Sequence, residues 1–451
     1  MIVMKFGGTS VAGTEGMRRV AAIVAAARDD EPVVVTSAMA GVTDSLARLL
    51  ETALGGDREG IEAGVASLAE RHLAVARELV PGDDDLAGRL ESLLRELRVL
   101  LRGVRLVGST TARSADALLG YGELLAQELL VAAMGAAGVD ARLVDAREVL
   151  VTDDHFGAAR PDVEATRARC AERVRPLARG GVVPVLGGYL GGTPEGIPTT
   201  LGRGGSDLSA AILGLALGAE RVEIWTDVDG LLSGDPRVIP GARVIPSISF
   251  REASELAFFG ARVLHPASID PAIQGGLPVH VRNSLAPDRA GTVIVPDAPG
   301  RRAAAVAVRR GLALVRLRAP GWRRRRGFLE RLSQRIAGQG IEVVHAWPGP
   351  LGIELLVPGG RPAEALGALL AEDGEQRVSD GLVLVSLVGE VLASRPMLWS
   401  RALALAAGAG ALRVLQGEGG ISLGAVTQAG RADDLARAWH GRFVEETDDE
   451  R

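Results

Sequence analysis

Short runs of apolar residues alternate with longer amphipathic segments along the first 298 residues of the chain. The runs predicted as strands are 2–6, 32–37, 141–144, 182–187, 221–226 and 279–281. The segments with helical spacing of their apolar residues include 16–28, 44–54, 115–136, 207–217 and 251–259. Apolar strands that are separated by helices are typical of a largely parallel sheet with helices on both faces. We therefore predict an α/β fold for this part of the chain.

Residues 57–106 show helical spacing without any strand pattern. The spacing is interrupted at Pro81-Gly82, which is followed by three aspartates at 83–85. Proline lacks the N–H that a helix interior needs, and glycine favours a turn. We predict an inserted helical hairpin with a solvated turn.

The pattern changes after a linker at residues 295–300. Two segments then repeat the order strand, helix, strand, strand, helix. The first consists of 312–317, 327–337, 341–346, 351–357 and 362–370, and the second of 382–387, 397–407, 412–416, 421–426 and 433–440. This order is typical of ferredoxin-like α+β modules, which sense ligands or serve oligomerisation. The predicted domains are 1–298, 299–378 and 379–451.

Composition limits the classes of function. Hydrophobic residues make up 47% of the 451 residues and charged residues 24%, as in globular proteins. The net charge of −5 gives no basic excess for binding nucleic acid. Cys170 is the only cysteine, which excludes an intrachain disulfide and fits a reducing cytosol. We expect a cytoplasmic protein without a membrane span. We also expect Cys170 to be a packing residue or a bystander, and not a nucleophile.

Lys5 is the only lysine among 51 Lys and Arg residues. Its compact ammonium group, on a thin stem, fits a narrow phosphate pocket better than a guanidinium group does. Gly7 and Gly8 follow at the end of the first predicted strand, where a backbone without Cβ atoms approaches a ligand closely. The pattern predicts a lysine that handles phosphate.

Three further motifs lie at predicted strand ends or on helices. Residues 36–43 lead from a strand into a helix, and the hydroxyl of Ser37 or Thr43 serves either as a helix cap or as a ligand contact. Glu123 lies in an apolar helix, where a buried carboxylate needs a cation such as a substrate ammonium; a solvated glutamate is the alternative. Residues 199–207 place Arg203 among three glycines at a helix start, which predicts an anion-binding site.

A further pair of segments, 225–230 and 234–237, follows the strand at 221–226 and is predicted to face a nucleotide. The sequence contains no metal-ligand cluster, nucleophile elbow or Walker-type loop. Phosphate cradles with one lysine and one arginine suit direct phosphoryl transfer to an acceptor that is already ionised, such as a carboxylate.

Seven motifs, in their order along the chain, resemble those of the aspartate kinases of the amino-acid kinase superfamily. They are KFGGTS (5–10), SAMAGVT (37–43), GYGE (120–123), TTLGRGGSD (199–207), WTDVDG (225–230), GDPR (234–237) and FGARVLHP (259–266). The resemblance implies an amino-acid kinase fold followed by two ACT modules. It also implies transfer of the γ-phosphoryl group of ATP to the β-carboxylate of L-aspartate, the first step of lysine, threonine and methionine biosynthesis. Mg²⁺ held mainly by the nucleotide phosphates, lysine or threonine as effector, and a homodimer or higher homo-oligomer are implied as well.

The resemblance also implies roles for residues of this chain. Lys5 would bridge the donor phosphate and the acceptor, and Asp207 would orient Lys5. The implied substrate-binding residues are Thr43 (side-chain carboxylate), Glu123 (ammonium), Arg203 (α-carboxylate), Gly204 and Ser206. The implied nucleotide-binding residues are Lys5, Gly7, Gly8, Ser10, Thr226, Asp227, Leu232, Arg237, Arg262 and Val263.

Four positions depart from the family pattern. Arg262 stands where the family usually has lysine, and Leu232 where it commonly has tyrosine. Val344 replaces a frequent acidic residue and Gly420 an effector-facing asparagine, so we expect weak or unusual feedback by lysine or threonine. Two other functions remain open from the sequence: a catalytically impaired paralogue that senses amino acids, and a kinase for another carboxylate.

Overall fold

The computed structural model describes residues 1–260, 268–298, 302–319, 321, 327–371 and 373–445. The chain forms two compact units. The first consists of Met1–Leu231, Val244–Phe250 and Val263–Ala298, and the second of Leu232–Arg243, Arg251–Arg262 and Pro299–Arg451. The two short segments 232–243 and 251–262 of the second unit therefore interrupt the domain predicted at 1–298.

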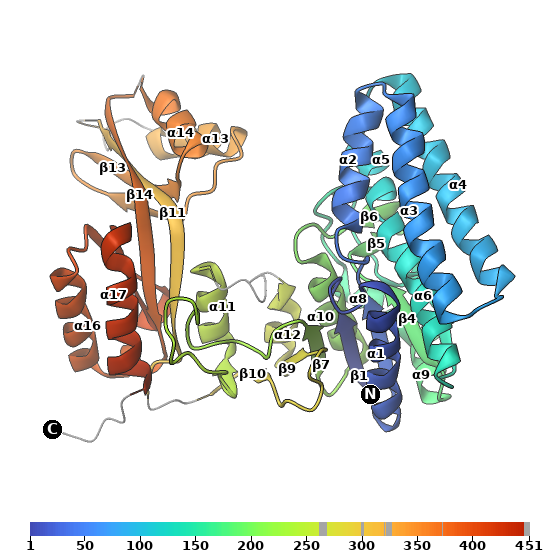
Figure 1. Cartoon of the computed structure of the whole chain (residues 1–451). Coiled ribbons are helices and arrows are strands. Elements are labelled where there is room, and N and C mark those ends of the chain that lie inside the picture. Colours follow the sequence, from blue (N-terminus) through green and yellow to red (C-terminus); the bar gives the residue numbers. More distant parts are fainter. Residues whose placement is uncertain (261–267, 299–301, 320, 322–326, 372, 446–451) are drawn as a thin grey trace. The chain divides into compact units, whose positions relative to one another are not determined.

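The first unit is built on an eight-stranded sheet with the order β3-β4-β2-β1-β7-β9-β10-β8 (Figure 1). The strands are β1 (Ile2–Phe6), β2 (Pro32–Thr36), β3 (Ala141–Leu143), β4 (Val183–Gly187), β7 (Val222–Thr226), β8 (Ser247–Ser249), β9 (Val279–Asn283) and β10 (Thr292–Val295). All neighbours are parallel except β9 and β10. Every residue of β1, β2 and β4 is buried, as expected for strands covered on both faces. The predicted fold class is confirmed.

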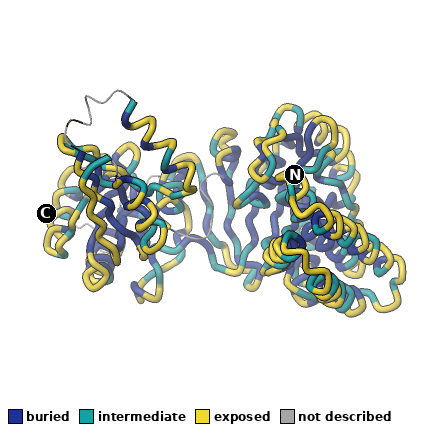
Figure 2. The backbone as a smooth tube through the Cα atoms, turned by 90° about the horizontal axis from the view of Figure 1, so that it is seen from above, coloured by how far each residue is buried: buried dark blue, intermediate teal, exposed yellow. Residues whose placement is uncertain are grey.

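Two groups of helices flank this sheet. On one side α6 (Tyr121–Ala136) packs on β2, β3 and β4 together with α1 (Gly13–Ala26), and on the other α10 (Gly205–Leu217) packs on β1 and β2 beside α8 (Val163–Arg173). The remaining helices and short strands of this unit are α2 (Val42–Leu54), α3 (Arg58–Leu79), α4 (Asp84–Val107), α5 (Ala112–Leu119), α7 (Ala146–Val149), α9 (Arg175–Arg179), α12 (Asp270–Gly275), β5 (Leu190–Gly192) and β6 (Pro198–Thr200). Figure 2 shows the strands mostly buried and the outer helices exposed along one side.

The predicted helical hairpin is confirmed as α3 and α4. Asp57 and Asp83 cap these helices, because each carboxylate accepts a hydrogen bond from a backbone N–H of the first turn. Leucines of α4 recur at helical spacing on its buried side; they are Leu86, Leu90, Leu94, Leu97 and Leu101.

The predicted helix 115–136 divides at Gly120 into α5 and α6. The stretch Ala112–Ala136 is long and apolar enough to cross a membrane, contrary to the expectation from the sequence, but 72% of its apolar 18-residue window is buried inside the fold. Such burial is typical of the core helix of a globular protein. Cys170 is also fully buried, and burial raises the pKa of its thiol to about 12, which confirms its packing role.

The second unit contains a six-stranded antiparallel sheet with the order β12-β13-β11-β14-β16-β15 (Figure 1). Its strands are β11 (Ala305–Arg318), β12 (His345–Pro348), β13 (Gly352–Pro358), β14 (Glu375–Val388), β15 (Arg413–Gln416) and β16 (Ser422–Gln428). Its helices are α11 (Phe250–Phe258, whose first residue belongs to the first unit), α13 (Phe328–Gly338), α14 (Arg361–Leu370), α15 (Val391–Ser394), α16 (Pro396–Gly408) and α17 (Ala429–His440). The predicted repeat of strands and helices is present.

The two long strands are shared between the repeats. Of the residues of β11, β13 pairs with 312–318. Of the residues of β14, β16 pairs with 382–388, and residues 384–388 of that stretch lie opposite 305–309 of β11. The start of β11 therefore completes the second module, and the start of β14 completes the first. The predicted boundary at 378/379 falls inside β14, because an alternating pattern does not reveal which strand a segment pairs with.

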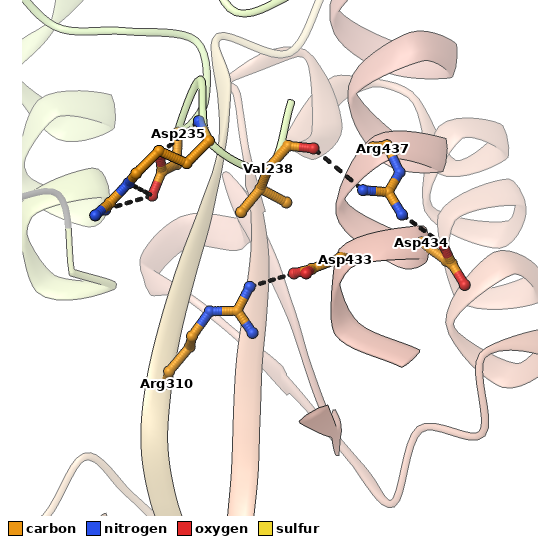
Figure 3. A network of polar contacts seen from close by, with 7 residues as sticks. Asp235, Val238, Arg310, Asp433, Asp434 and Arg437 are labelled. Atoms are coloured by element: carbon orange, nitrogen blue, oxygen red, sulfur yellow. Dashed lines mark hydrogen bonds and ion pairs between the residues drawn. The ribbon is translucent and has the colours of Figure 1, made fainter. Parts of the chain in front are cut away.

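The segment 232–243 is attached to the second module (Figure 3). Val238 and Ile239 belong to the same buried cluster as Trp439 of α17. Arg437 donates to the Val238 carbonyl oxygen at 3.3 Å, and the Ser233 hydroxyl lies 2.8 Å from Nε2 of His440. Apolar burial and hydrogen bonds together hold this segment in the second unit.

Candidate active site

Lys5 and Asp207 form an ion pair at the centre of the first unit. Lys5 lies near the end of β1, the strand between β2 and β7, and Asp207 lies in the first turn of α10. The Lys5 Nζ atom is 2.6 Å from Asp207 Oδ1, and the two side chains are only 11% and 14% exposed. Low exposure strengthens the attraction between the charges, so Asp207 holds the ammonium group in a defined position.

A cavity of about 350 Å³ adjoins this pair, at the carboxyl ends of β1 and β2 and the start of α10. Open parallel sheets bind ligands at this edge. The predicted site residues that line it are Lys5, Gly8, Thr43, Glu123, Gly204, Ser206 and Asp207. The remaining lining residues are Ser37, Ala38, Met39, Ala40, Gly41, Asp44, Tyr189, Gly202 and Gly205.

Glycine at position 8 is required by a close approach of two loops. A Cβ atom there would lie 2.8 Å from the carbonyl oxygen of Ala38. The Ala40 N–H donates to the carbonyl oxygen of Gly8 at 3.0 Å, so the loops after β1 and β2 are joined. Gly204, which precedes α10, has φ +69°, a backbone conformation that favours glycine. The predicted glycine motifs therefore shape the cavity wall.

Glu123 is buried at the cavity, with only 3% of its surface exposed. The Ala38 N–H donates to its Oε1 at 3.2 Å, while its buried Oε2 has no hydrogen-bond partner within the described part of the chain. Burial raises the pKa of Glu123 to about 8, and the hydrogen bond from Ala38 opposes that rise. A solvated glutamate is excluded, and the free oxygen is suited to accept from a ligand cation.

Arg203 is exposed between Gly202 and Gly204, which both have positive φ. It does not line the cavity, and it has no ion-pair partner among the residues that the structure describes. An unpaired guanidinium beside the cavity residue Gly204 is available for a carboxylate. Its role as the α-carboxylate ligand stays a prediction.

Of the predicted nucleotide-binding residues, Lys5 and Gly8 line the cavity. The others of the first unit lie as follows. Gly7 and Thr226 lie at the ends of the adjacent strands β1 and β7, where the Gly7 N–H donates to the Trp225 carbonyl oxygen at 3.1 Å. Asp227 follows and is exposed. Ser10 is 1% exposed, and its hydroxyl lies 2.8 Å from the Ser284 hydroxyl, so this oxygen is engaged inside the fold.

The other four predicted nucleotide-binding residues belong to the second unit or lie outside the described residues. Leu232 and Arg237 belong to the second unit. Arg237 is 88% exposed and forms an ion pair with Asp235 at 2.7 Å. Arg262 and Val263 lie outside the described residues. The roles of all four stay predictions.

Sequence reasoning missed Tyr189 and Asp116. Tyr189 lines the cavity with φ +66°, which is unusual for a residue with a side chain and marks local strain at a functional site. Asp116, 2% exposed, accepts hydrogen bonds from the N–H and the hydroxyl of Thr200, both at 2.8 Å, and so fixes the strand before the glycine loop. Two signals in the sequence were available. Tyr189 is an aromatic residue directly after Gly187-Gly188, and Asp116 is an acidic residue in an apolar helix.

Comparisons with known proteins agree with this arrangement. The profile of the amino acid kinase family matches residues 1–283. Aspartokinase 2, chloroplastic, of Arabidopsis thaliana is 33% identical over 469 residues, covering 98% of this chain and 84% of the relative. Lysine-sensitive aspartokinase 3 of Escherichia coli is 35% identical over 404 residues, covering 87% of this chain and 88% of the relative.

Two solved structures are also similar over nearly the whole chain. The crystal structure of E. coli aspartokinase III in complex with lysine and aspartate has a TM-score of 0.87 at 31% identity, covering 99% of this chain and 100% of that one. The structure of the same enzyme with aspartate and ADP has a TM-score of 0.82 at 31% identity, covering 98% and 99% of the two chains.

Proposed function

The chain belongs to the amino acid kinase family as an aspartokinase, and from this membership we propose the reaction that it catalyses. It transfers the γ-phosphoryl group of ATP to the β-carboxylate of L-aspartate and gives 4-phospho-L-aspartate and ADP. A carboxylate oxygen forms the new bond to the γ-phosphorus while the bond between this phosphorus and the β,γ-bridging oxygen breaks. The electron pair of that bond leaves with ADP. The β-carboxylate is ionised at neutral pH, so no general base is needed.

In this proposal Lys5 supplies the main positive charge at the reacting phosphoryl group. Its ammonium group faces the cavity and has a fixed position, because Asp207 holds it at 2.6 Å. A preorganised cation stabilises the negative charge on the oxygens of the γ-phosphoryl group in the transition state. Gly7 and Gly8 keep side chains away from this point, so a phosphate can approach the backbone.

Glu123 and Arg203 recognise the amino acid part of the substrate in this proposal. The unpartnered Oε2 of Glu123 accepts a hydrogen bond from the aspartate ammonium, which compensates the burial of the carboxylate. Arg203 binds the α-carboxylate, and Thr43 and Ser206 line the cavity for the side chain of aspartate. A free amino acid presents these charges, whereas an acylated one lacks the ammonium group.

We also propose that Mg²⁺ is bound mainly by the phosphates of ATP. Among the described residues, no three acidic, histidine or cysteine side chains come together as a metal cage. Magnesium commonly combines substrate phosphates, water and one or two carboxylates, so such a cage is not required. The ion would neutralise charge on the β- and γ-phosphates.

The buried Lys5–Asp207 pair beside the half-satisfied Glu123 is the observation that supports this function most strongly. It is tested by measuring ADP release with Mg-ATP and either L-aspartate, L-glutamate or N-acetyl-L-aspartate. We expect turnover with L-aspartate and at most weak turnover with the other two. Binding of aspartate without ADP release would indicate a sensor and would contradict the proposal.

For regulation, we propose that lysine or threonine acts at the C-terminal modules with weak or unusual inhibition. Val344 stands where the family often has an acidic residue, and it is 4% exposed. Because its side chain is apolar, it offers no charge to a ligand ammonium. In the second module, Gly420 offers no side chain where the family has an effector-facing asparagine. The same ADP assay with each amino acid tests this, and a low inhibition constant for either one would refute it.

We further propose a homodimer or higher homo-oligomer. β12 is an edge strand of the second unit, so within the described residues one of its sides has no neighbouring strand, and such edges readily pair with another chain. Light scattering coupled to gel filtration measures the mass, and a monomer at assay concentration would refute this proposal.

A further inference from the structure

Helix α11 is bound to the loop between β15 and β16 through one carboxylate. The Ser422 hydroxyl donates to Oε2 of Glu255 at 2.6 Å, and the Glu418 N–H donates to Oε1 at 3.1 Å. All three residues belong to the second unit. Each oxygen of the carboxylate therefore has its own donor, and hydrogen bonds to an ionised acceptor are stronger than neutral ones.

The loop is shaped for this close approach. A Cβ atom on Gly417 would collide with both the Glu255 carboxylate and the Ser422 hydroxyl. Gly419 has φ +63°, and a Cβ atom there would collide with the guanidinium of Arg251 on α11. Ser422 is fully buried, so its hydroxyl is not a surface group that happens to meet an acid. The loop and the helix fit each other.

A second carboxylate of the same helix binds the same module. Glu252, one turn before Glu255, is 3% exposed, and its Oε1 accepts a hydrogen bond from the N–H of Glu390 at 2.8 Å. Residues three apart lie on the same side of a helix. One side of α11 thus presents two acidic groups to donors of the second module.

We propose that the loop 417–422 is a carboxylate-binding site whose ligand is Glu255 of the same chain. A serine hydroxyl and a backbone N–H are the donors that the carboxylate of a free amino acid would use, and here an internal side chain occupies them. The second module therefore holds α11 in place of a free amino acid. Small carboxylates enter this site only when Glu255 is removed.

The test measures thermal unfolding of the full chain carrying Glu255→Ala, with increasing potassium acetate or, at equal ionic strength, potassium chloride. We expect a lowered Tm that acetate restores in a saturable manner and chloride does not. The wild type and the control Glu364→Ala, which removes an exposed glutamate of α14, should respond equally to both salts. Equal responses of Glu255→Ala to the two salts would overturn the carboxylate site.

Two further variants separate binding of acetate from general stabilisation. Glu255→Ala combined with Ser422→Ala should lose the acetate response, because the main donor is gone; a persistent response would overturn the assignment. Glu255→Gln serves if the alanine variant does not fold. Its amide fills the site, so the Tm should fall less and acetate should have no specific effect, whereas a specific effect would again overturn the proposal.

Discussion

Replacing Lys5 by methionine tests the central charge of the proposed site. The substitution keeps an unbranched side chain of similar length but leaves the carboxylate of Asp207 without the cation 2.6 Å away. Breaking a buried ion pair from one side costs about 3–5 kcal/mol. We expect the lower end, about 3 kcal/mol of the free energy of unfolding, because Asp207 lines the cavity and its side chain is still 14% exposed.

The effect on catalysis should be larger in kcat than in the KM for aspartate. Loss of one preorganised donor to a developing negative charge typically lowers kcat by about 10²–10³-fold. Lys5 is proposed to contact the transferred phosphoryl group, whereas Glu123 and Arg203 bind the amino acid, so the KM for aspartate should change by less than about threefold.

Lys5→Arg separates charge from shape. The site is narrow, since a Cβ atom on Gly7 would lie 3.5 Å from Lys5 Nζ and 3.6 Å from the Trp225 carbonyl oxygen. A guanidinium keeps the ion pair with Asp207 but cannot occupy the position of the compact ammonium. We expect kcat to stay about 10²-fold below the wild type, with less loss of stability than in Lys5→Met.

ADP release at saturating ATP gives kcat and KM, and urea denaturation gives the free energy of unfolding. Arg113→Met is a matched control, because Arg113 is an exposed cation of α5 without an ion-pair partner in the part of the chain that the structure describes. The double variant Lys5→Met/Asp207→Asn should regain stability but not activity. Nearly normal turnover of Lys5→Arg, or a raised KM with normal kcat in Lys5→Met, would refute the assigned role.

Four further predictions concern Glu123, Arg203 and Cys170. Glu123 must lose a proton before it can bind an ammonium group, and its pKa is about 8. The kcat/KM for aspartate should therefore rise about tenfold per pH unit from about pH 6 to 8. The variant Glu123→Gln should abolish this rise. Without aspartate, the unfolded chain ionises Glu123 above its ordinary pKa of 4.5 while the folded chain keeps the proton up to about 8. The free energy of unfolding should therefore fall by about 1.4 kcal/mol per pH unit between pH 4.5 and about pH 8, as measured by urea denaturation. If the free energies of unfolding of the wild type and of Glu123→Gln differed by the same amount at every pH, this prediction would be contradicted. Arg203→Ala should raise the KM for aspartate at least about tenfold with kcat and Tm little changed, as the loss of a charged hydrogen bond predicts, and an unchanged KM would exclude Arg203 as a ligand. A thiol reagent should leave the buried Cys170 unmodified in the native protein and modify it in urea; fast native modification would show that its helix opens.

Much of the fold and part of the site could be predicted from the sequence. The apolar runs at β1, β2 and β4 and the helical spacing of α3 and α4 are local patterns, and they form the expected elements. Lys5, Glu123 and Asp207 meet at one cavity, because the carboxyl ends of β1 and β2 lie there together with the first turns of α6 and α10.

Other features could not be predicted. Strands β5, β6, β8 and β10 have three or four residues each, too few for a period to stand out. The hydroxyl of Ser10 sits in a motif that suggests a phosphate contact, yet it bonds with Ser284, which lies 274 positions away along the chain. Such a partner leaves no local trace in the sequence.

By itself, the sequence determined which segments become helices and strands and which residue types carry charge at strand ends, because side-chain periodicity and turn chemistry act over a few neighbouring residues. Only the tertiary structure decided which strands β11 and β14 pair with, that one oxygen of Glu123 is left for a ligand, and that Glu255 occupies the donors of Ser422 and Glu418. These outcomes depend on burial and on contacts between residues far apart in the chain, where packing selects one partner among many that are chemically equivalent.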